Sequence, residues 1–172
     1  MDIKIRGETQ DDYHIITEIN DLAFGGTGEG QLIITLRKNK EFIPDLSLVA
    51  LEDDRIVGHI LFYPIFIEAA NNTFPTISLA PMAVQPNFQN KGIGTKLVND
   101  GLQRCKDMQF DSVIVLGHPE YYPRFGFKPA SQWNLYSDFE APDEAFMALE
   151  LEENSLAGKR GKVVYPKEYL EV

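Results

Sequence analysis

The segment that decides the fold joins a strand to a long helix and reads MAVQPNFQNKGIGTK, residues 82–96. Pro86 ends the strand, because proline has no backbone N–H for a ladder. Gly92 and Gly94 remove Cβ atoms where a backbone must approach a ligand closely. The helix that follows offers N–H groups without intrahelical partners and the positive end of its dipole. Such a terminus binds phosphate, so we expect a phosphate site at this turn.

Two familiar phosphate-binding patterns do not fit the spacing of these glycines. A dinucleotide fingerprint needs a third glycine three residues after the second, where this chain has Leu97. A P-loop needs Gly-Lys-Ser/Thr, whereas Gly94-Thr95-Lys96 reverses that order. A plain glycine turn without a ligand is the remaining structural alternative.

Hydrophobic periodicity on either side of this turn predicts an α+β fold. Helical spacing of apolar residues predicts helices at about 10–23, from the 28–32 segment to Arg37 or Lys38, and at 92–108. Strand patterns, with a tight turn at Asp53-Asp54, predict strands at 47–52, 55–68, 73–84, 111–117, 146–151 and 162–165. The early strands form an antiparallel meander, and the strand, helix, strand order after it forms a parallel crossover. We therefore expect a mixed, mainly antiparallel sheet with a parallel βαβ unit.

The turn also matches a third pattern, which is Gln or Arg, two residues, Gly, one residue, and Gly or Ala, directly after a strand. With Met82-Ala83-Val84 and Pro86 before it, the segment resembles the acetyl-CoA site of the GNAT superfamily of N-acetyltransferases. The order of elements resembles that fold across nearly the whole chain. The resemblance implies acetyl-CoA as co-substrate, bound by Met82, Ala83, Val84, Gln89, Asn90, Lys91, Gly92, Ile93, Gly94 and Thr95.

Pro81 adds a physical point, since proline inside a strand is tolerated only at an edge or a bulge. We expect a bulge there. In the GNAT superfamily a bulge on this strand splays it from the next parallel strand, and the pantetheine arm enters the gap. The resemblance places that gap between about 79–84 and 113–117, and backbone N–H groups near Met82 and Ala83 could polarise the thioester carbonyl.

A second resemblance lies in the run LGHPEYYPRFGF, residues 116–127, which is similar to one predicted-acetyltransferase branch of the superfamily. Many members carry a tyrosine four residues before the glycine of a Gly-Phe pair, which is Tyr122 here. A phenol can donate a proton or hydrogen bond to the departing thiolate, so Tyr122 is our candidate general acid. The alternative is that Tyr121 and Tyr122 only pack against neighbouring aromatic residues.

A general base is also needed, because an alkyl amine is mostly protonated at neutral pH. Glu29, at the start of the second helix, is similar to an acidic position in the same branch and is a candidate base or acceptor contact. A carboxylate in the first turn of a helix is also common without any catalytic role, since it interacts favourably with the helix dipole. Both interpretations of Glu29 stay open.

Length and composition further narrow the class of protein to which this chain can belong. The length predicts one domain over residues 1–172, and the formal charge of −10 argues against nucleic-acid binding. The single cysteine, Cys105, is expected to be a buried structural thiol, and the scattered histidines show no metal-ligand spacing. The longest apolar run, at 56–67, is neither a signal peptide nor a membrane span, so we expect a cytoplasmic protein.

Taken together, the sequence predicts an N-acetyltransferase that moves an acetyl group from acetyl-CoA to a primary amine by direct attack in a ternary complex. The amine acceptor could be a small molecule or another protein. We expect the enzyme to need no metal and to be a monomer or a homodimer. One alternative is a non-catalytic acyl-CoA sensor or interaction module. Another is transfer of a longer acyl chain, which depends on how Phe62, Phe66 and Met82 shape the thioester end.

Overall fold

The computed structural model describes residues 1–172, which form two compact units interleaved along the sequence. The first unit contains Met1–Tyr63, Ala80–Arg104 and Lys167–Val172, and the second contains Pro64–Leu79 and Cys105–Pro166. Strands β3 (Arg55–Glu68) and β4 (Thr73–Val84) and helix α3 (Ile93–Asp107) each contribute residues to both units. The expectation of a single domain stays a prediction.

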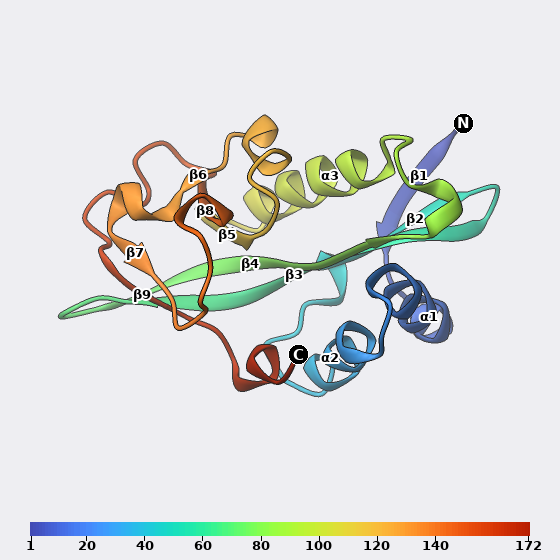
Figure 1. Cartoon of the computed structure of the whole chain (residues 1–172), viewed down its shortest axis with the longest axis horizontal. Helices are drawn as coiled ribbons and strands as arrows, with labels where there is room; N and C mark the ends of the chain where they lie inside the picture. The colour runs from blue at the N-terminus through green and yellow to red at the C-terminus, as the bar shows by residue number, and fades with distance from the viewer. The chain divides into compact units, whose positions relative to one another are not determined.

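The first unit is built on strands in the order β1-β2-β3-β4 (Figure 1). The pairs β1–β2 and β2–β3 are antiparallel. Asp53 and Asp54, which join β2 to β3, have φ angles of 48° and 64°, as a two-residue hairpin turn with the twist of the strands requires. The bounds of these strands are β1 Ile3–Gly7, β2 Ser47–Glu52, β3 Arg55–Glu68 and β4 Thr73–Val84.

Helices cover both faces of the first unit's strands, with α3 on one face and α1 and α2 on the other (Figure 1). Side chains alternate between faces along a strand. Accordingly, Gly58 and Phe62 of β3 contact α3, whereas His59 reaches Asn20 of α1 on the opposite face. The bounds of the helices are α1 Tyr13–Phe24, α2 Gly28–Leu36 and α3 Ile93–Asp107.

The second unit contains part of β3 and β4 and several short strands. β5 pairs with β4 in parallel at Ser78 and Ile114, and β8 pairs antiparallel with the other edge of β5. The parallel crossover through α3 and the mixed, mainly antiparallel sheet are therefore confirmed. The strands of this unit are β5 Ser112–Leu116, β6 Lys128–Pro129, β7 Leu135–Tyr136, β8 Phe146–Glu150 and β9 Gly161–Val164.

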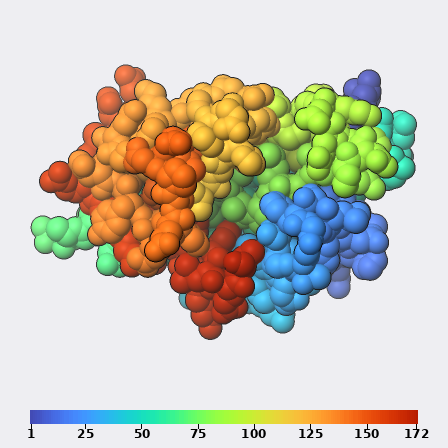
Figure 2. Space-filling model, in the orientation of Figure 1, coloured from blue at the N-terminus to red at the C-terminus, as the bar shows by residue number.

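The structure also contains elements that the sequence patterns did not predict. β1 is a five-residue edge strand whose alternating run, Ile3-Lys4-Ile5-Arg6, is only four residues long, and β6 and β7 have two residues each. A short C-terminal 3-10 helix, Lys167–Glu171, packs against α2 within the first unit. Figure 2 shows this red segment beside the blue residues of α2.

Candidate active site

The predicted phosphate turn follows the end of β4 in the first unit and is held by hydrogen bonds. The backbone N–H of Gln85 donates to the Val57 carbonyl of β3 (2.8 Å), which fixes where the strand ends. The side-chain amide of Gln89 folds back and donates to the Val84 carbonyl (3.1 Å). The side chain of Gln89 therefore closes the turn. The sequence motif did not predict this hydrogen bond.

Two residues of the turn adopt left-handed backbone conformations, Asn90 with φ 63° and Gly92 with φ 83°. A Cβ built on Gly92 would meet no atom within 4 Å, so the space in front of this residue is open. The Gly92 carbonyl accepts a hydrogen bond from the Lys96 N–H (3.1 Å), and α3 begins at the buried Ile93. The open space therefore lies at the start of a helix, where N–H groups favour an anion.

Two cations lie beside the same turn. The guanidinium of Arg55 is 4.9 Å from the centre of the Phe88 ring, and the ammonium of Lys91 is 5.4 Å from it. Both charges favour an anionic ligand in a protein whose overall charge is negative. The sequence identified Lys91 but not Arg55, because Arg55 lies at the start of β3, far from the turn along the chain.

The predicted thioester segment is the last part of β4. Ala83 is buried, and its neighbours Met82 and Val84 are partly exposed, as alternation along a strand requires. The peptide bond between Ala80 and Pro81 is cis. The bulge expected at Pro81 and the splayed gap beyond it stay predictions.

Tyr122 lies in the second unit, in a short 3-10 helix (Tyr122–Phe125) that follows β5. Its ring meets those of Tyr121 and Phe127 edge to face, with centroids 5.1 and 5.7 Å away, and only 7% of the residue is exposed. A Cβ on Gly117 would lie 2.4 Å from Cε2 of Tyr122, so glycine at 117 is what lets the ring approach the backbone.

Burial raises the pKa of the Tyr122 phenol above its ordinary value, with a smaller contribution from Tyr121. The phenol therefore stays protonated through the neutral range and can act as a hydrogen-bond or proton donor. Burial of the ring is enough to raise the pKa of the phenol. This environment therefore agrees with both interpretations of Tyr122, as a packing residue and as a hydrogen-bond or proton donor.

Glu29 occupies the first turn of α2 and is partly exposed. The structure therefore keeps both interpretations of Glu29, since the carboxylate is accessible and also lies at the positive end of the helix dipole. Cys105 is fully buried in α3, and burial raises the pKa of its thiol to about 12. The prediction that Cys105 is a buried structural thiol is confirmed.

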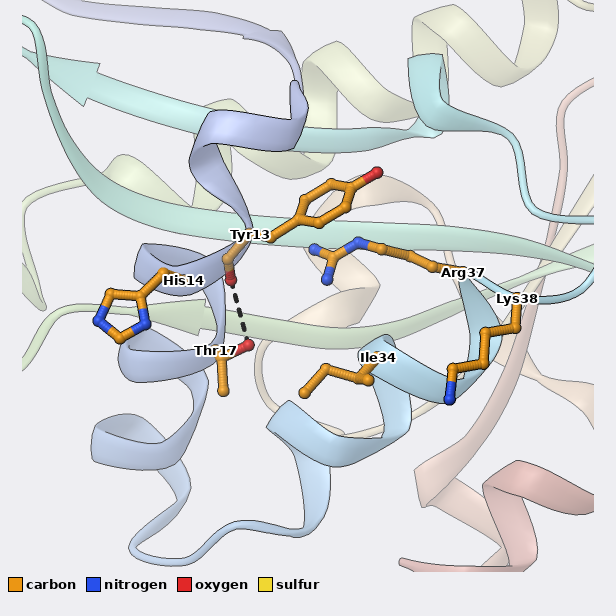
Figure 3. A pocket seen from close by; sticks show the side chains of 6 residues that line it. All are labelled: Tyr13, His14, Thr17, Ile34, Arg37 and Lys38. Carbon is orange, nitrogen blue, oxygen red and sulfur yellow. Dashed lines mark hydrogen bonds between the residues drawn. The ribbon is translucent and has the colours of Figure 1, made fainter.

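A separate pocket of about 540 Å³ opens between α1 and α2, lined by Tyr13, His14, Thr17, Ile34, Arg37 and Lys38 (Figure 3). The guanidinium of Arg37 stacks over the Tyr13 ring at 3.8 Å and donates to both carboxylate oxygens of Glu8. Its charge is thus already neutralised by a buried partner. None of the predicted site residues lines this pocket.

Comparisons with known proteins assign the family. The sequence model of the acetyltransferase (GNAT) domain matches residues 4–130. The chain is 36% identical over 130 residues to the uncharacterized N-acetyltransferase YjhQ of Escherichia coli K12, covering 75% of this chain and 72% of that protein. The chain belongs to the GNAT acetyltransferase family.

Solved structures of GNAT proteins agree with this assignment. The GNAT family N-acetyltransferase YhbS from Escherichia coli, in complex with CoA, superposes with a TM-score of 0.90 at 27% identity, covering 98% of this chain and 92% of that one. A GNAT acetyltransferase from Brucella melitensis, in complex with acetyl-CoA, gives 0.78 at 30% identity and 98% coverage of both chains. The GNAT fold predicted from the sequence is confirmed.

The predicted site residues of this GNAT chain are divided between its two units. Glu29, the end of β4 and the turn at 89–95 belong to the first unit, and Tyr122 belongs to the second. No group of three or more His, Cys, Asp or Glu side chains is arranged to hold a metal ion. No helix combines the length and apolar character needed to cross a bilayer.

Proposed function

We propose that this GNAT protein transfers an acetyl group from acetyl-CoA to a primary amine by direct attack in a ternary complex. The observation that carries the proposal is the turn before α3. Its open left-handed glycine, Gly92, lies at a helix start beside Arg55 and Lys91. Membership of the GNAT family and the CoA and acetyl-CoA complexes of its structural relatives support it.

The residues present fit a CoA pyrophosphate. In this proposal the backbone from Gln89 to Thr95, through Asn90, Lys91, Gly92, Ile93 and Gly94, surrounds the phosphates, which the start of α3 and the neighbouring cations stabilise. Met82, Ala83 and Val84 lie along the acyl-bearing arm, and N–H groups near Met82 and Ala83 donate to the thioester oxygen. Acetyl-CoA supplies an activated acyl group.

Transfer makes one bond and breaks one. The amine nitrogen bonds to the acyl carbon, the C–S bond breaks, and the amine loses a proton while the thiolate of CoA gains one. Tyr122 donates to the departing sulfur, since its raised pKa keeps the phenol protonated. Glu29 takes the amine proton, directly or through water, or contacts the amine of the acceptor.

The test is an acetyl-transfer assay with a panel of primary amines, which detects released CoA. We expect Tyr122→Phe to lower kcat by roughly 100-fold with little change in acetyl-CoA affinity, since the loss falls on the transition state. Tyr121→Phe is the matched control, because Tyr121 packs in the same aromatic group. Binding of acetyl-CoA without transfer to any amine would instead identify a sensor, and preference for octanoyl-CoA would identify a longer acyl substrate.

A further inference from the structure

The C-terminal 3-10 helix is anchored to the first unit by a small polar and aromatic cluster. Its residue Tyr169 is only 7% exposed, and its ring meets that of Tyr63 edge to face, with centroids 6.1 Å apart. The Asn39 amide donates to the Tyr63 hydroxyl (3.2 Å) and to the Glu168 carboxylate (3.3 Å). The ring contact with Tyr63 holds the Tyr169 ring in one orientation.

That orientation directs the Tyr169 hydroxyl at the backbone of β4. The hydroxyl donates a hydrogen bond of 2.9 Å to the carbonyl oxygen of Ala80, a residue 89 positions earlier in the chain. Ala80 directly precedes Pro81, and Met82 follows. The C-terminal helix is thus tied to the strand segment that leads into the proposed thioester contacts.

The orientation of this peptide group matters for the residues after it. Peptide groups are planar, and the ring of Pro81 fixes its own φ, so the chain has few free rotations between the Ala80 carbonyl and the N–H of Met82. Donors that stabilise a developing oxyanion must lie within about 2.7–3.1 Å of it. A small rotation of the Ala80 peptide therefore moves the proposed donors out of range.

We propose that Tyr169 is a positioning residue. Its hydrogen bond to Ala80 fixes the direction of the Met82 and Ala83 N–H groups. This inference rests on the proposed function for its effect on rate. Tyr169 contacts neither substrate, and its influence passes through the backbone of β4.

The kinetic test compares Tyr169→Phe with Tyr63→Phe. Each variant loses one hydroxyl from the same cluster and keeps the ring contact between the two residues. We expect Tyr169→Phe to lower kcat by roughly tenfold, the size of one lost hydrogen bond, with KM for acetyl-CoA unchanged. We expect Tyr63→Phe to keep the kcat of the wild type. Equal kcat values in the two variants, with an active wild type, would overturn the proposal.

A second readout does not depend on turnover. In ¹⁵N-labelled protein we expect the amide resonances of Met82 and Ala83 to shift in Tyr169→Phe and to stay in place in Tyr63→Phe. Unchanged resonances in Tyr169→Phe would overturn the inference whatever the activity. If the wild type is inactive but the Met82 and Ala83 resonances still shift in Tyr169→Phe, the proposed function is contradicted and the coupling through Ala80 is established.

Discussion

At Tyr122, burial among aromatic rings raises the pKa of the phenol above its ordinary value of about 10. The conjugate acid of a thiolate has a pKa of about 8.5, so full proton transfer from this phenol to sulfur is uphill. A hydrogen bond to the developing thiolate requires no such transfer. At the scale of this residue, the proposed role of Tyr122 is therefore to stabilise charge on sulfur by a hydrogen bond before the thiolate is released into water.

The raised pKa of Tyr122 predicts the alkaline side of the pH profile. The active form is the protonated one, and it persists until the pH passes the raised pKa. We therefore expect kcat to rise as the acceptor amine loses its proton and to show no fall through pH 10. The measurement is kcat at saturating acetyl-CoA and amine from pH 6 to 10.5. A fall in kcat with an apparent pKa below 10, absent from Tyr122→Phe, would contradict this assignment.

The close approach of Gly117 to the Tyr122 ring gives a further prediction. A methyl group there would lie 2.4 Å from the Tyr122 ring, so in Gly117→Ala the ring must move. We expect a loss of unfolding free energy of about 1–3 kcal/mol and a lower kcat. Urea denaturation and the transfer assay measure both.

Gly26→Ala is the control for Gly117→Ala, since a Cβ on Gly26 meets nothing within 4 Å. We expect that variant to keep both the stability and the kcat of the wild type. A Gly117→Ala protein with wild-type kcat would show that the position of the Tyr122 ring is irrelevant to turnover.

At the scale of elements, a chain of hydrogen bonds in the first unit links α1, β2 and β3 with Glu8, which directly follows β1, and Arg37, which directly follows α2. The Ser47 hydroxyl donates to Glu8, whose carboxylate also accepts from Arg37. Ser47 Oγ lies 2.8 Å from His59 Nε2, and His59 Nδ1 lies 3.4 Å from the Asn20 amide. Because serine has one proton to give, Nε2 of His59 carries the proton and donates to Ser47.

This network predicts an acid-dependent loss of stability. Complete burial, with a smaller contribution from Arg37, lowers the pKa of His59 to about 3. The unfolded chain binds this proton at about pH 6.5, so the folded state loses stability as pH falls from about 6.5 towards 3. One proton contributes at most about 1.4 kcal/mol per pH unit. We expect His59→Gln to show a shallower fall in unfolding free energy between pH 7 and 5 than the wild type.

The titration of His59 can also be followed directly. By NMR, the imidazole resonances of His59 should stay in place from pH 8 to 5, because its pKa in the folded protein is lowered to about 3. Titration of His59 near pH 6.5 in the folded protein would contradict the network.

How far the sequence predicted the elements depended on how each element is stabilised. Helix α3 and strands β2 to β5 carry clear periodicity and defined ends, and their predicted bounds agree with the structure within two residues. Strand β1 is held by pairing with β2, and the helix at 167–171 by Tyr169 packing on Tyr63. The alternating run of β1, Ile3-Lys4-Ile5-Arg6, is only four residues long, and the contact between Tyr63 and Tyr169, which are far apart in sequence, leaves no local pattern.

The same limit applies to the candidate site. Gly92 and Tyr122 stand in local motifs, so the sequence alone singles them out. Arg55 and Tyr169 do not, because Arg55 meets Phe88 and Tyr169 meets Ala80 only after folding.

At the scale of the whole molecule, the proposed roles are spread over both units, with the phosphate turn in the first and Tyr122 in the second. Only measurements on the complete chain can therefore test them together. The chain has 26 acidic and 16 basic residues, so its net negative charge repels a polyanionic ligand at long range. The proposed binding of CoA therefore relies on local groups, namely the start of α3 with Arg55 and Lys91.

The most direct test of this account is isothermal titration of the folded protein with acetyl-CoA, with ATP as a comparison ligand. Gly92→Glu places a carboxylate in the proposed phosphate site. Gly158→Glu is the matched control, because Gly158 also has a positive φ, of 77°, and no atom within 4 Å of a built Cβ. We predict saturable binding to the wild type and to Gly158→Glu, and a loss of roughly 100-fold or more in Gly92→Glu. No binding to the folded wild type, or equal binding to the two glutamate variants, would contradict the account.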